Sequence, residues 1–181
     1  SLFEEDRFFR TMQGEVLRML PIELQRGCPY QCTFCEDPIL NAIYRESNQH
    51  YHRIKSPQRV INEIKFFIKE HKVNYVYFNA ETFFAMPPKS FQLLAELYTN
   101  EIGLPFWIQT RPETITEERV SLLKQMNISN INIGLEHGNE EFRARVLKRR
   151  MKNERIVQSL KILEKADIPV TVNNIMGYPD E

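Results

Sequence analysis

Cysteine is scarce in this chain of 181 residues: it occurs three times, and all three copies lie between positions 28 and 35. An odd number of cysteines cannot be fully paired in disulfides, and the rest of the chain has no disulfide-rich composition. The spacing also lacks the paired ligand motifs of structural zinc sites, which usually supply four ligands. The histidines that would have to provide a fourth ligand do not stand at finger-like spacing: His50, His52, His71 and His137.

Charge of one sign and long apolar runs are also lacking. Lysine plus arginine and aspartate plus glutamate both number 24, so no excess charge directs the whole chain to nucleic acid or to a membrane. No run of about 18 apolar residues is present, so we expect no transmembrane helix. Because the N-terminus shows no signal-peptide pattern, we expect a protein of the reducing cytoplasm. The length and a hydrophobic content of 42% suffice for one domain with a sizeable core.

The three cysteines form one compact motif. Cys28, Cys32 and Cys35 are spaced C-x3-C-x2-C, with the aromatic Phe34 just before the last cysteine. Three thiolates on one loop can bind three irons of a [4Fe–4S] cluster and leave the fourth iron open to a small molecule. Gly27 suits the sharp turn that such a loop needs. We therefore interpret the motif as an iron–sulfur site rather than as three reduced structural thiols.

Strand and helix patterns alternate along most of the chain. Strands are predicted at residues 22–25, 73–78, 105–110, 130–136 and 169–173, the first of them leading into the Cys loop. Helix starts are predicted by Ser56-Pro57, Pro87-Pro88, Thr116, Asn139 and Asn153. This alternation indicates βα units, and hence an α/β fold with about five parallel strands.

The first twenty residues stand apart from this alternation. Phe9, Met12, Val16 and Leu20 have roughly helical spacing. We interpret residues 1–20 as a lead-in segment that covers one edge of the domain or ends an upstream domain. Residues 21–181 then form the core domain. The polar stretch from Asp37 to Lys55 contains His50 and His52, and we expect a strand-like polar loop near the substrate entrance there; a metal role for the two histidines is the weaker interpretation.

Polar residues mark the inner face of the expected sheet. In folds of this kind, ligands gather at the C-terminal ends of the strands. Arg111 ends the third strand, and Glu136 ends the fourth, where Asn132, Gly134 and Glu136 alternate with apolar residues. Because strands covered by helices are usually apolar on both faces, this pattern predicts an inner cavity that binds something. An ordinary salt bridge remains the alternative for Arg111.

The motif and the strand ends together resemble the radical S-adenosylmethionine (radical SAM) superfamily. The Cys loop is similar to its CxxxCxΦC signature, with Phe34 as the aromatic Φ. Residues 133–138 resemble the family's GLESG segment with His137 in place of Ser, and residues 177–181 resemble its GxPxE ending. Residues 79–81 match its Gly-Gly-Glu motif only in the glutamate. Residues 20–28 look closest to the branch that includes cobalamin-binding enzymes.

The resemblance implies a fold, cofactors and partners. The fold is a partial (β/α)6 barrel whose sixth βα unit is missing, which would leave an open edge for pairing with a second chain. The cofactors are a [4Fe–4S] cluster on the three cysteines and SAM, with cobalamin as a further cofactor in the related branch. Reductive SAM cleavage would give a 5′-deoxyadenosyl radical acting on an unknown substrate, with flavodoxin or ferredoxin as electron donor. The implied SAM contacts are Tyr30, Phe34, Asn79, Ala80, Glu81, Arg111, Glu136, Gly177 and Tyr178.

A basic run leaves other functions open. It consists of Arg143, Arg145, Lys148, Arg149, Arg150 and Lys152. Placed on a helix, the run would bind a phosphorylated substrate or RNA, although a solvated face is the more ordinary explanation. Methylthio transfer to RNA therefore stays an alternative activity. So does a catalytically silent barrel fragment that holds a metal only structurally or not at all.

Overall fold

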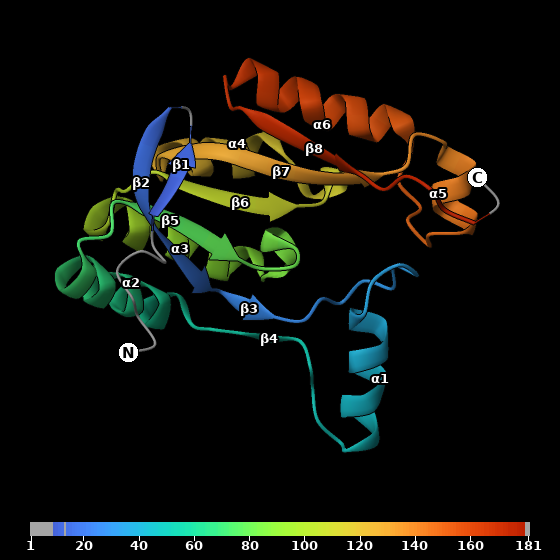
Figure 1. The fold of residues 1–181 in the computed structure, drawn as a ribbon, viewed down its shortest axis with the longest axis horizontal. Helices are drawn as coiled ribbons and strands as arrows, with labels where there is room; N and C mark the ends of the chain where they lie inside the picture. Colours follow the sequence, from blue (N-terminus) through green and yellow to red (C-terminus); the bar gives the residue numbers. More distant parts are fainter. Residues whose placement is uncertain (1–8, 13, 180–181) are drawn as a thin grey trace.

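A curled sheet forms the centre of the molecule (Figure 1). The structure is a computed structural model that describes residues 9–12 and 14–179. Six strands lie in the order β1-β2-β5-β6-β7-β8, and every neighbouring pair except β1 and β2 is parallel. The expected α/β half barrel with five parallel strands is therefore confirmed. The strands are β1 (Phe9–Met12), β2 (Glu15–Glu23), β5 (Tyr75–Asn79), β6 (Phe106–Thr110), β7 (Ile128–Glu136) and β8 (Val170–Asn174).

Helices cover the outer face of this sheet. α2 contacts α3, α3 contacts α4 and α4 contacts α6, so these four form one layer in chain order. The two remaining helices, α1 and α5, lie near the Cys loop (Figure 1). The helices are α1 (Asp37–Glu46), α2 (Pro57–His71), α3 (Pro88–Glu101), α4 (Glu117–Gln125), α5 (Glu140–Arg145) and α6 (Asn153–Lys165), with short 3-10 turns η2 (Phe83–Ala85) and η3 (Pro112–Thr114). Over the described ranges, no helix has the length and apolar character needed to cross a membrane.

The core lies between the sheet and its helix layer. Phe78 of β5 contacts the rings of Phe83, Tyr98 and Phe106 at centroid distances of 5.4 to 5.6 Å. All four side chains are fully buried. Tyr77 on β5 and Trp107 and Gln109 on β6 are only partly buried, because successive side chains of a strand point to opposite faces. One face of the sheet thus serves the core, and the other faces the interior of the half barrel.

A hairpin replaces the helix that we predicted from the spacing of Phe9, Met12, Val16 and Leu20. β1 pairs antiparallel with β2, so that Thr11 lies opposite Val16. The turn between the two strands contains Gly14 at φ 83°, a left-handed conformation that glycine adopts without steric cost. The helical prediction is therefore wrong for the described part of this segment. Residues 1–8 and 13 of the lead-in lie outside the described residues.

The predicted loop between Asp37 and Lys55 is also partly wrong, because α1 occupies its first ten residues. Pro38 stands in the first turn of the helix, where its missing N–H is not needed. Ile39 and Ile43 of this helix are 65% and 52% exposed. Further along, β4 (Arg53–Ile54) pairs antiparallel with β3 (Gln25–Arg26) and holds the entry to the Cys loop.

The basic run does not lie on one helix. α5 ends at Arg145, and the residues from Val146 to Lys152 form a loop before α6. Arg143 is fully buried and donates hydrogen bonds to the backbone carbonyls of His137 at 2.7 Å and Gly138 at 3.0 Å. Arg149 is 4% exposed. A solvated face is therefore the wrong description of these two arginines, because the loop folds back over the strand ends.

The other edge of the sheet is formed by β8, most of whose residues are exposed. Val172 in its centre is 40% exposed. Pairing of a second chain along this edge, as expected from the family resemblance, stays a prediction. The strand ends at Asn174, one residue later than predicted, and the other parallel strands after β2 differ from their predicted bounds by one or two residues.

Candidate functional site

The three cysteines lie on the loop that follows β3, at the carboxyl ends of the parallel strands. Cys28 and Cys32 are each 7% exposed, and Cys35 is half-buried. Gly27 enters the loop at φ 78°, and a Cβ at this position would meet a ring carbon of Tyr51 at 2.5 Å. The loop therefore requires glycine here. A tight turn follows, in which the Cys35 backbone N–H donates to the carbonyl of Cys32 at 3.2 Å.

Contacts from distant parts of the chain hold this loop in place. The Thr33 backbone N–H donates to the carbonyl of Leu147 at 3.3 Å, and its hydroxyl donates to the carbonyl of Val146 at 2.7 Å. Asn41 of α1 donates its side-chain amide to the carbonyl of Cys28 at 3.0 Å. The Cys loop is thus fixed both by the helix that follows it and by the loop after α5.

A cavity of about 160 Å³ lies between the Cys loop and the ends of β5 to β8, and we call it the thiol cavity. It collects residues from six separate parts of the chain. Seven of the residues predicted from the sequence line it: Cys28, Cys32, Phe34, Cys35, Glu81, Arg111 and Glu136. The structure therefore brings together all three predicted metal ligands and four of the nine predicted SAM contacts.

Arg111 links the thiol cavity to its surroundings. Its side chain is 8% exposed and forms an ion pair with Glu113. One guanidinium N–H donates to the Cys32 Sγ at 3.1 Å, and the Tyr30 ring lies 3.9 Å from the guanidinium carbon. The ordinary salt bridge that we kept as an alternative is thus present. The same side chain also places positive charge beside a predicted cluster ligand.

Glu136 and Arg149 form an ion pair in the wall of the thiol cavity. Their charged groups are 3.7 Å apart, and both side chains are largely buried. Arg149 also donates to the carbonyl of Gly134 and lies 3.9 Å from the Cys32 Sγ. Burial raises the pKa of the Glu136 carboxyl, while the positive charges of Arg149 and Arg111 act in the opposite direction. The pair presents one anionic and one cationic group to whatever occupies the cavity.

The comparison with protein families decides what this arrangement is. The sequence model described as the radical SAM superfamily matches residues 22–181. The chain belongs to the radical SAM superfamily. The expected membership of this superfamily is therefore confirmed, as is the prediction of an enzyme.

Individual relatives agree with this assignment. An anaerobic magnesium-protoporphyrin IX monomethyl ester cyclase from Rubrivivax gelatinosus is 23% identical over 158 residues, covering 86% of this chain and 27% of the cyclase. The radical SAM methyltransferase TsrM from Kitasatospora setae, solved with cobalamin and a [4Fe–4S] cluster, matches with a TM-score of 0.72 and 17% identity, covering 91% of this chain and 32% of TsrM.

A second solved structure is the cobalamin-dependent radical SAM enzyme OxsB, with aqua-cobalamin and SAM bound. It matches with a TM-score of 0.67 and 21% identity, covering 87% of this chain and 24% of OxsB. At these identities the two solved structures show a shared fold. The radical SAM chain spans between 24% and 32% of the length of the three proteins compared.

Two charged residues of the radical SAM chain that sequence reasoning did not assign to the site also line the thiol cavity. Arg149 is one, and Asp37, which is 3% exposed at the start of α1, is the other. Within the described part of the chain, the Asp37 Oδ2 and the Arg149 Nε are buried without a hydrogen-bond partner. Burial raises the pKa of Asp37, and nearby Glu81 adds to that shift. Asp37 could have been noticed from its place two residues after Cys35.

Residues 79 and 80 lie at the edge of the site. Asn79 ends β5 with an exposed side chain, and its backbone carbonyl accepts a hydrogen bond from the Leu24 N–H at 3.1 Å. Ala80 is 1% exposed and packs in the core. Glu81, the next residue, does line the thiol cavity. Of the predicted contacts at residues 79–81, only the glutamate therefore belongs to the cavity wall.

The C-terminal segment of the radical SAM chain is placed beside α5. Tyr178 packs with Phe142 at 5.4 Å and with His137 at 6.1 Å between ring centroids. Gly177 is exposed at φ 82°. Neither residue lines the thiol cavity, and their assignment to SAM stays a prediction. The His137 ring lies tilted against the Phe142 ring, with 4.3 Å between the ring centroids, and so takes part in this aromatic group.

A site for a single metal ion finds no support in the residues that the structure describes. No three Cys, His, Asp or Glu side chains there are placed to hold one metal ion together. His50 and His52 line a different pocket, which lies beside the Cys loop and is also lined by Arg45 of α1. Burial lowers the pKa of His52. A cluster places each thiolate on a different iron, so its ligands do not converge on one point as zinc ligands do.

Proposed function

We propose that the chain binds a [4Fe–4S] cluster through Cys28, Cys32 and Cys35 and cleaves SAM reductively. One observation supports this above the others: the three thiols and the oppositely charged Glu136 and Arg149 line one cavity at the carboxyl ends of the strands. The chemistry that the bound cluster and SAM supply together is one-electron cleavage of a C–S bond, which yields methionine and a 5′-deoxyadenosyl radical.

The donor set suits an iron–sulfur cluster. Its members are thiols on one rigid loop, and thiolates are the ligands that such clusters take from proteins. Burial raises the pKa of the Cys28 and Cys35 thiols, so cluster binding has to displace protons from them. Arg111 and Arg149 direct positive charge at the Cys32 Sγ, where they would balance the negative charge of a bound cluster.

The amino acid part of SAM would meet complementary charges in the same cavity. Its ammonium group would donate to the Glu136 carboxylate, and Glu81 offers a second carboxylate. Its carboxylate would accept from Arg149, whose buried Nε has no partner in the described part of the chain. Glu136 ends β7, and Arg149 donates to the Gly134 carbonyl of the same strand, so this charged pair is preorganised before SAM arrives.

The chain is proposed to act within a longer, cobalamin-dependent protein. TsrM and OxsB, which share its fold, were solved with cobalamin bound. The relatives differ in reaction, since one is a cyclase and another a methyltransferase, so they do not narrow the class of substrate. A reducing cytoplasmic location is proposed as well, because the three cysteines must remain thiols to take up a cluster.

Anaerobic iron–sulfur reconstitution followed by EPR spectroscopy tests this function. The reduced protein should give a [4Fe–4S]⁺ signal that shifts when SAM is added, because SAM binds at the open iron. A signal that ignores SAM would contradict the SAM part of the proposal and leave a cluster-binding barrel. Absence of any cluster after reconstitution would contradict the ligand assignment.

A further inference from the structure

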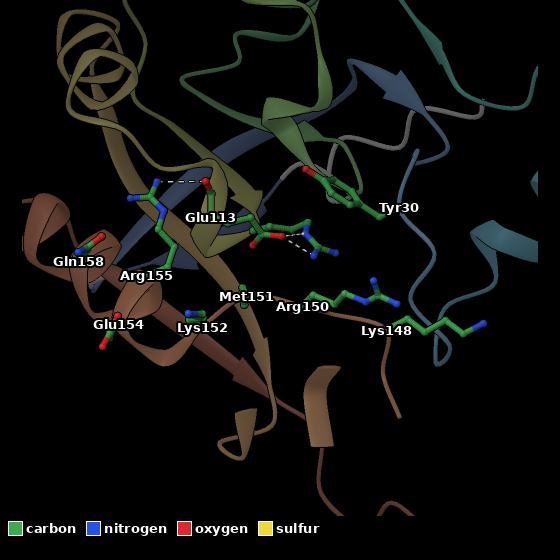
Figure 2. Close-up of a pocket in the computed structure, with 10 residues that line it drawn as sticks. Tyr30, Glu113, Lys148, Arg150, Met151, Lys152, Glu154, Arg155 and Gln158 are labelled. Atoms are coloured by element: carbon green, nitrogen blue, oxygen red, sulfur yellow. Dashed lines mark hydrogen bonds and ion pairs between the residues drawn. The ribbon is translucent and has the colours of Figure 1, made fainter. Parts of the chain in front are cut away.

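A second and larger cavity, of about 560 Å³, lies next to the Cys loop, and we call it the basic pocket (Figure 2). Tyr30 and Lys148 lie on one side of it, and Arg155 and Glu113 on the other (Figure 2). Five cationic side chains line it: Arg111, Lys148, Arg150, Lys152 and Arg155. Only two acidic side chains, Glu113 and Glu154, line it as well.

Three of these cations are available to a partner. Arg111 is paired with Glu113, and Arg155 donates to backbone carbonyls. Lys148, Arg150 and Lys152 are exposed, and no ion pair is seen for them among the described residues. α6 begins at the pocket, so the positive end of its dipole adds to their field. Because the chain as a whole carries no net charge, this is a local concentration of positive charge.

The basic pocket is separated from the predicted cluster ligands by very little protein. Tyr30 lines the pocket and stands in sequence between Cys28 and Cys32. Arg111 lines both the basic pocket and the thiol cavity. It lies on the Tyr30 ring at 3.9 Å and reaches the Cys32 Sγ at 3.1 Å. A molecule seated in the pocket would therefore be one side chain away from a ligand of the cluster.

The side of the cluster that faces the thiol cavity would be occupied by the reactants. SAM and substrate would fill the thiol cavity, so a protein that delivers electrons has to approach the Cys loop from outside the barrel. The other flank of the loop, lined by Pro29 and Gln31, offers a single arginine, Arg45. Of these two outer surfaces, the basic pocket carries the stronger charge. Electron-transfer encounters bury little surface and depend on complementary charge for their rate.

We infer that the basic pocket is the docking surface for an acidic electron-donor protein that reduces the cluster. This inference rests on the proposed function. In the step it describes, a reduced flavoprotein passes one electron to the oxidised [4Fe–4S]²⁺ cluster. The anionic flavin hydroquinone would lose one electron and become the neutral semiquinone with no change in its protons, and a cluster bound to the three cysteines would gain that electron and become [4Fe–4S]⁺. Lys148, Arg150 and Lys152 bind the acidic surface of the donor, and Tyr30 lies at the point nearest the cluster.

The test compares two charge reversals, Arg150→Glu in the basic pocket and Arg45→Glu on the other flank of the loop. Both arginines are exposed, and no ion pair is seen for either among the described residues. The probe is a flavodoxin with net negative charge. Arg150→Glu should slow cluster reduction by flavodoxin hydroquinone about tenfold or more at low ionic strength, whereas Arg45→Glu should change it little. High salt should reduce the difference between the variants.

Two further measurements separate this inference from the proposed function. Dithionite should reduce the cluster equally in both variants, and SAM should shift the EPR signal of both, since neither arginine lies in the thiol cavity. Binding of oxidised flavodoxin to the metal-free chain should be weakened by Arg150→Glu alone, and this readout needs no cluster. Equal rates and equal binding in the two variants would overturn the inference. Loss of single-stranded RNA binding in Arg150→Glu, with flavodoxin binding unchanged, would also overturn it and identify an RNA site.

Discussion

The two faces of the central sheet differ in what they do, although they are built from the same strands. On the outer face, Phe106, Ile108 and Ile131 are completely buried beneath helices. On the inner face, Gln109 and Glu136 are half-buried and line the thiol cavity. Alternation along each strand thus separates side chains that stabilise the fold from side chains that form the site. Substitutions on the two faces should therefore have different effects, and five predictions examine that separation.

The largest effect is expected from Cys32→Ala in the Cys loop. The variant lacks one of three proposed ligands, so the brown iron–sulfur absorbance should be lost after reconstitution. The thermal midpoint of the metal-free protein should change little, because the loop remains tied through Thr33. Iron analysis and circular dichroism measure both quantities. The matched control is Gln31→Ala, an exposed neighbour that should load normally. Four irons per chain in Cys32→Ala would refute the ligand assignment.

Phe106→Ala, on the outer face, should lower the stability of the fold without removing any residue of the thiol cavity. Phe106 is fully buried and contacts Phe78 and Tyr98. Removing such a ring typically lowers the free energy of unfolding by about 3–5 kcal/mol, because transfer and cavity terms add. Urea unfolding of the metal-free protein measures the change. Phe66→Ala, at a ring that is 57% exposed, is the control and should cost much less. Equal losses in the two variants would argue against the packed outer face.

The inner face is examined by Glu136→Gln. The variant keeps the shape of the side chain but removes the charge proposed to accept from the SAM ammonium, so SAM affinity should fall about ten- to hundredfold. Glu118→Gln, at an exposed carboxylate in the first turn of α4, should leave the affinity unchanged. Titration of SAM into the reconstituted protein, monitored by EPR, provides the measurement.

The pH dependence of SAM binding sharpens the same test. Burial raises the pKa of Glu136, so its carboxylate takes up a proton at a higher pH than an ordinary glutamate. Only the ionised form attracts an ammonium group, so the affinity of the wild type should decline as the pH is lowered through that raised pKa. Glu136→Gln should lack this decline. A parallel pH profile in the two proteins would remove Glu136 from the ammonium site.

Much of the fold followed from the sequence because local signals agreed with the tertiary structure. Thr116 and Asn139 were predicted as helix caps, and their side chains accept hydrogen bonds from the Arg119 and Phe142 backbone N–H groups. The parallel strands followed from their apolar runs. The β1–β2 hairpin did not, because its residues also fit helical spacing and the single glycine at position 14 decides between the two.

The site was predictable only where its residues belong to one local motif. The Cys loop is continuous in sequence, so its three thiols were found together. Arg149 was missed because nothing in a basic run distinguishes a buried arginine from an exposed one. Its burial depends on the loop after α5, which is tied to the Cys loop through Thr33 and the carbonyls of Val146 and Leu147. Such a contact between distant segments has no signature in the sequence.

The smallest effect is expected from Thr116→Ala, in the helix layer far along the chain from the Cys loop. The Thr116 hydroxyl accepts from the Arg119 backbone N–H at 3.2 Å and caps α4. Losing an N-cap of this kind costs about 1 kcal/mol of stability, because one helix N–H loses its partner. Urea unfolding should show that loss, while iron content and the SAM-dependent EPR shift stay as in the wild type. Thr116→Ser keeps the hydroxyl and should recover most of the stability. If Thr116→Ala instead impaired cluster loading, helix layer and site would be coupled, and the separation between the two faces would fail.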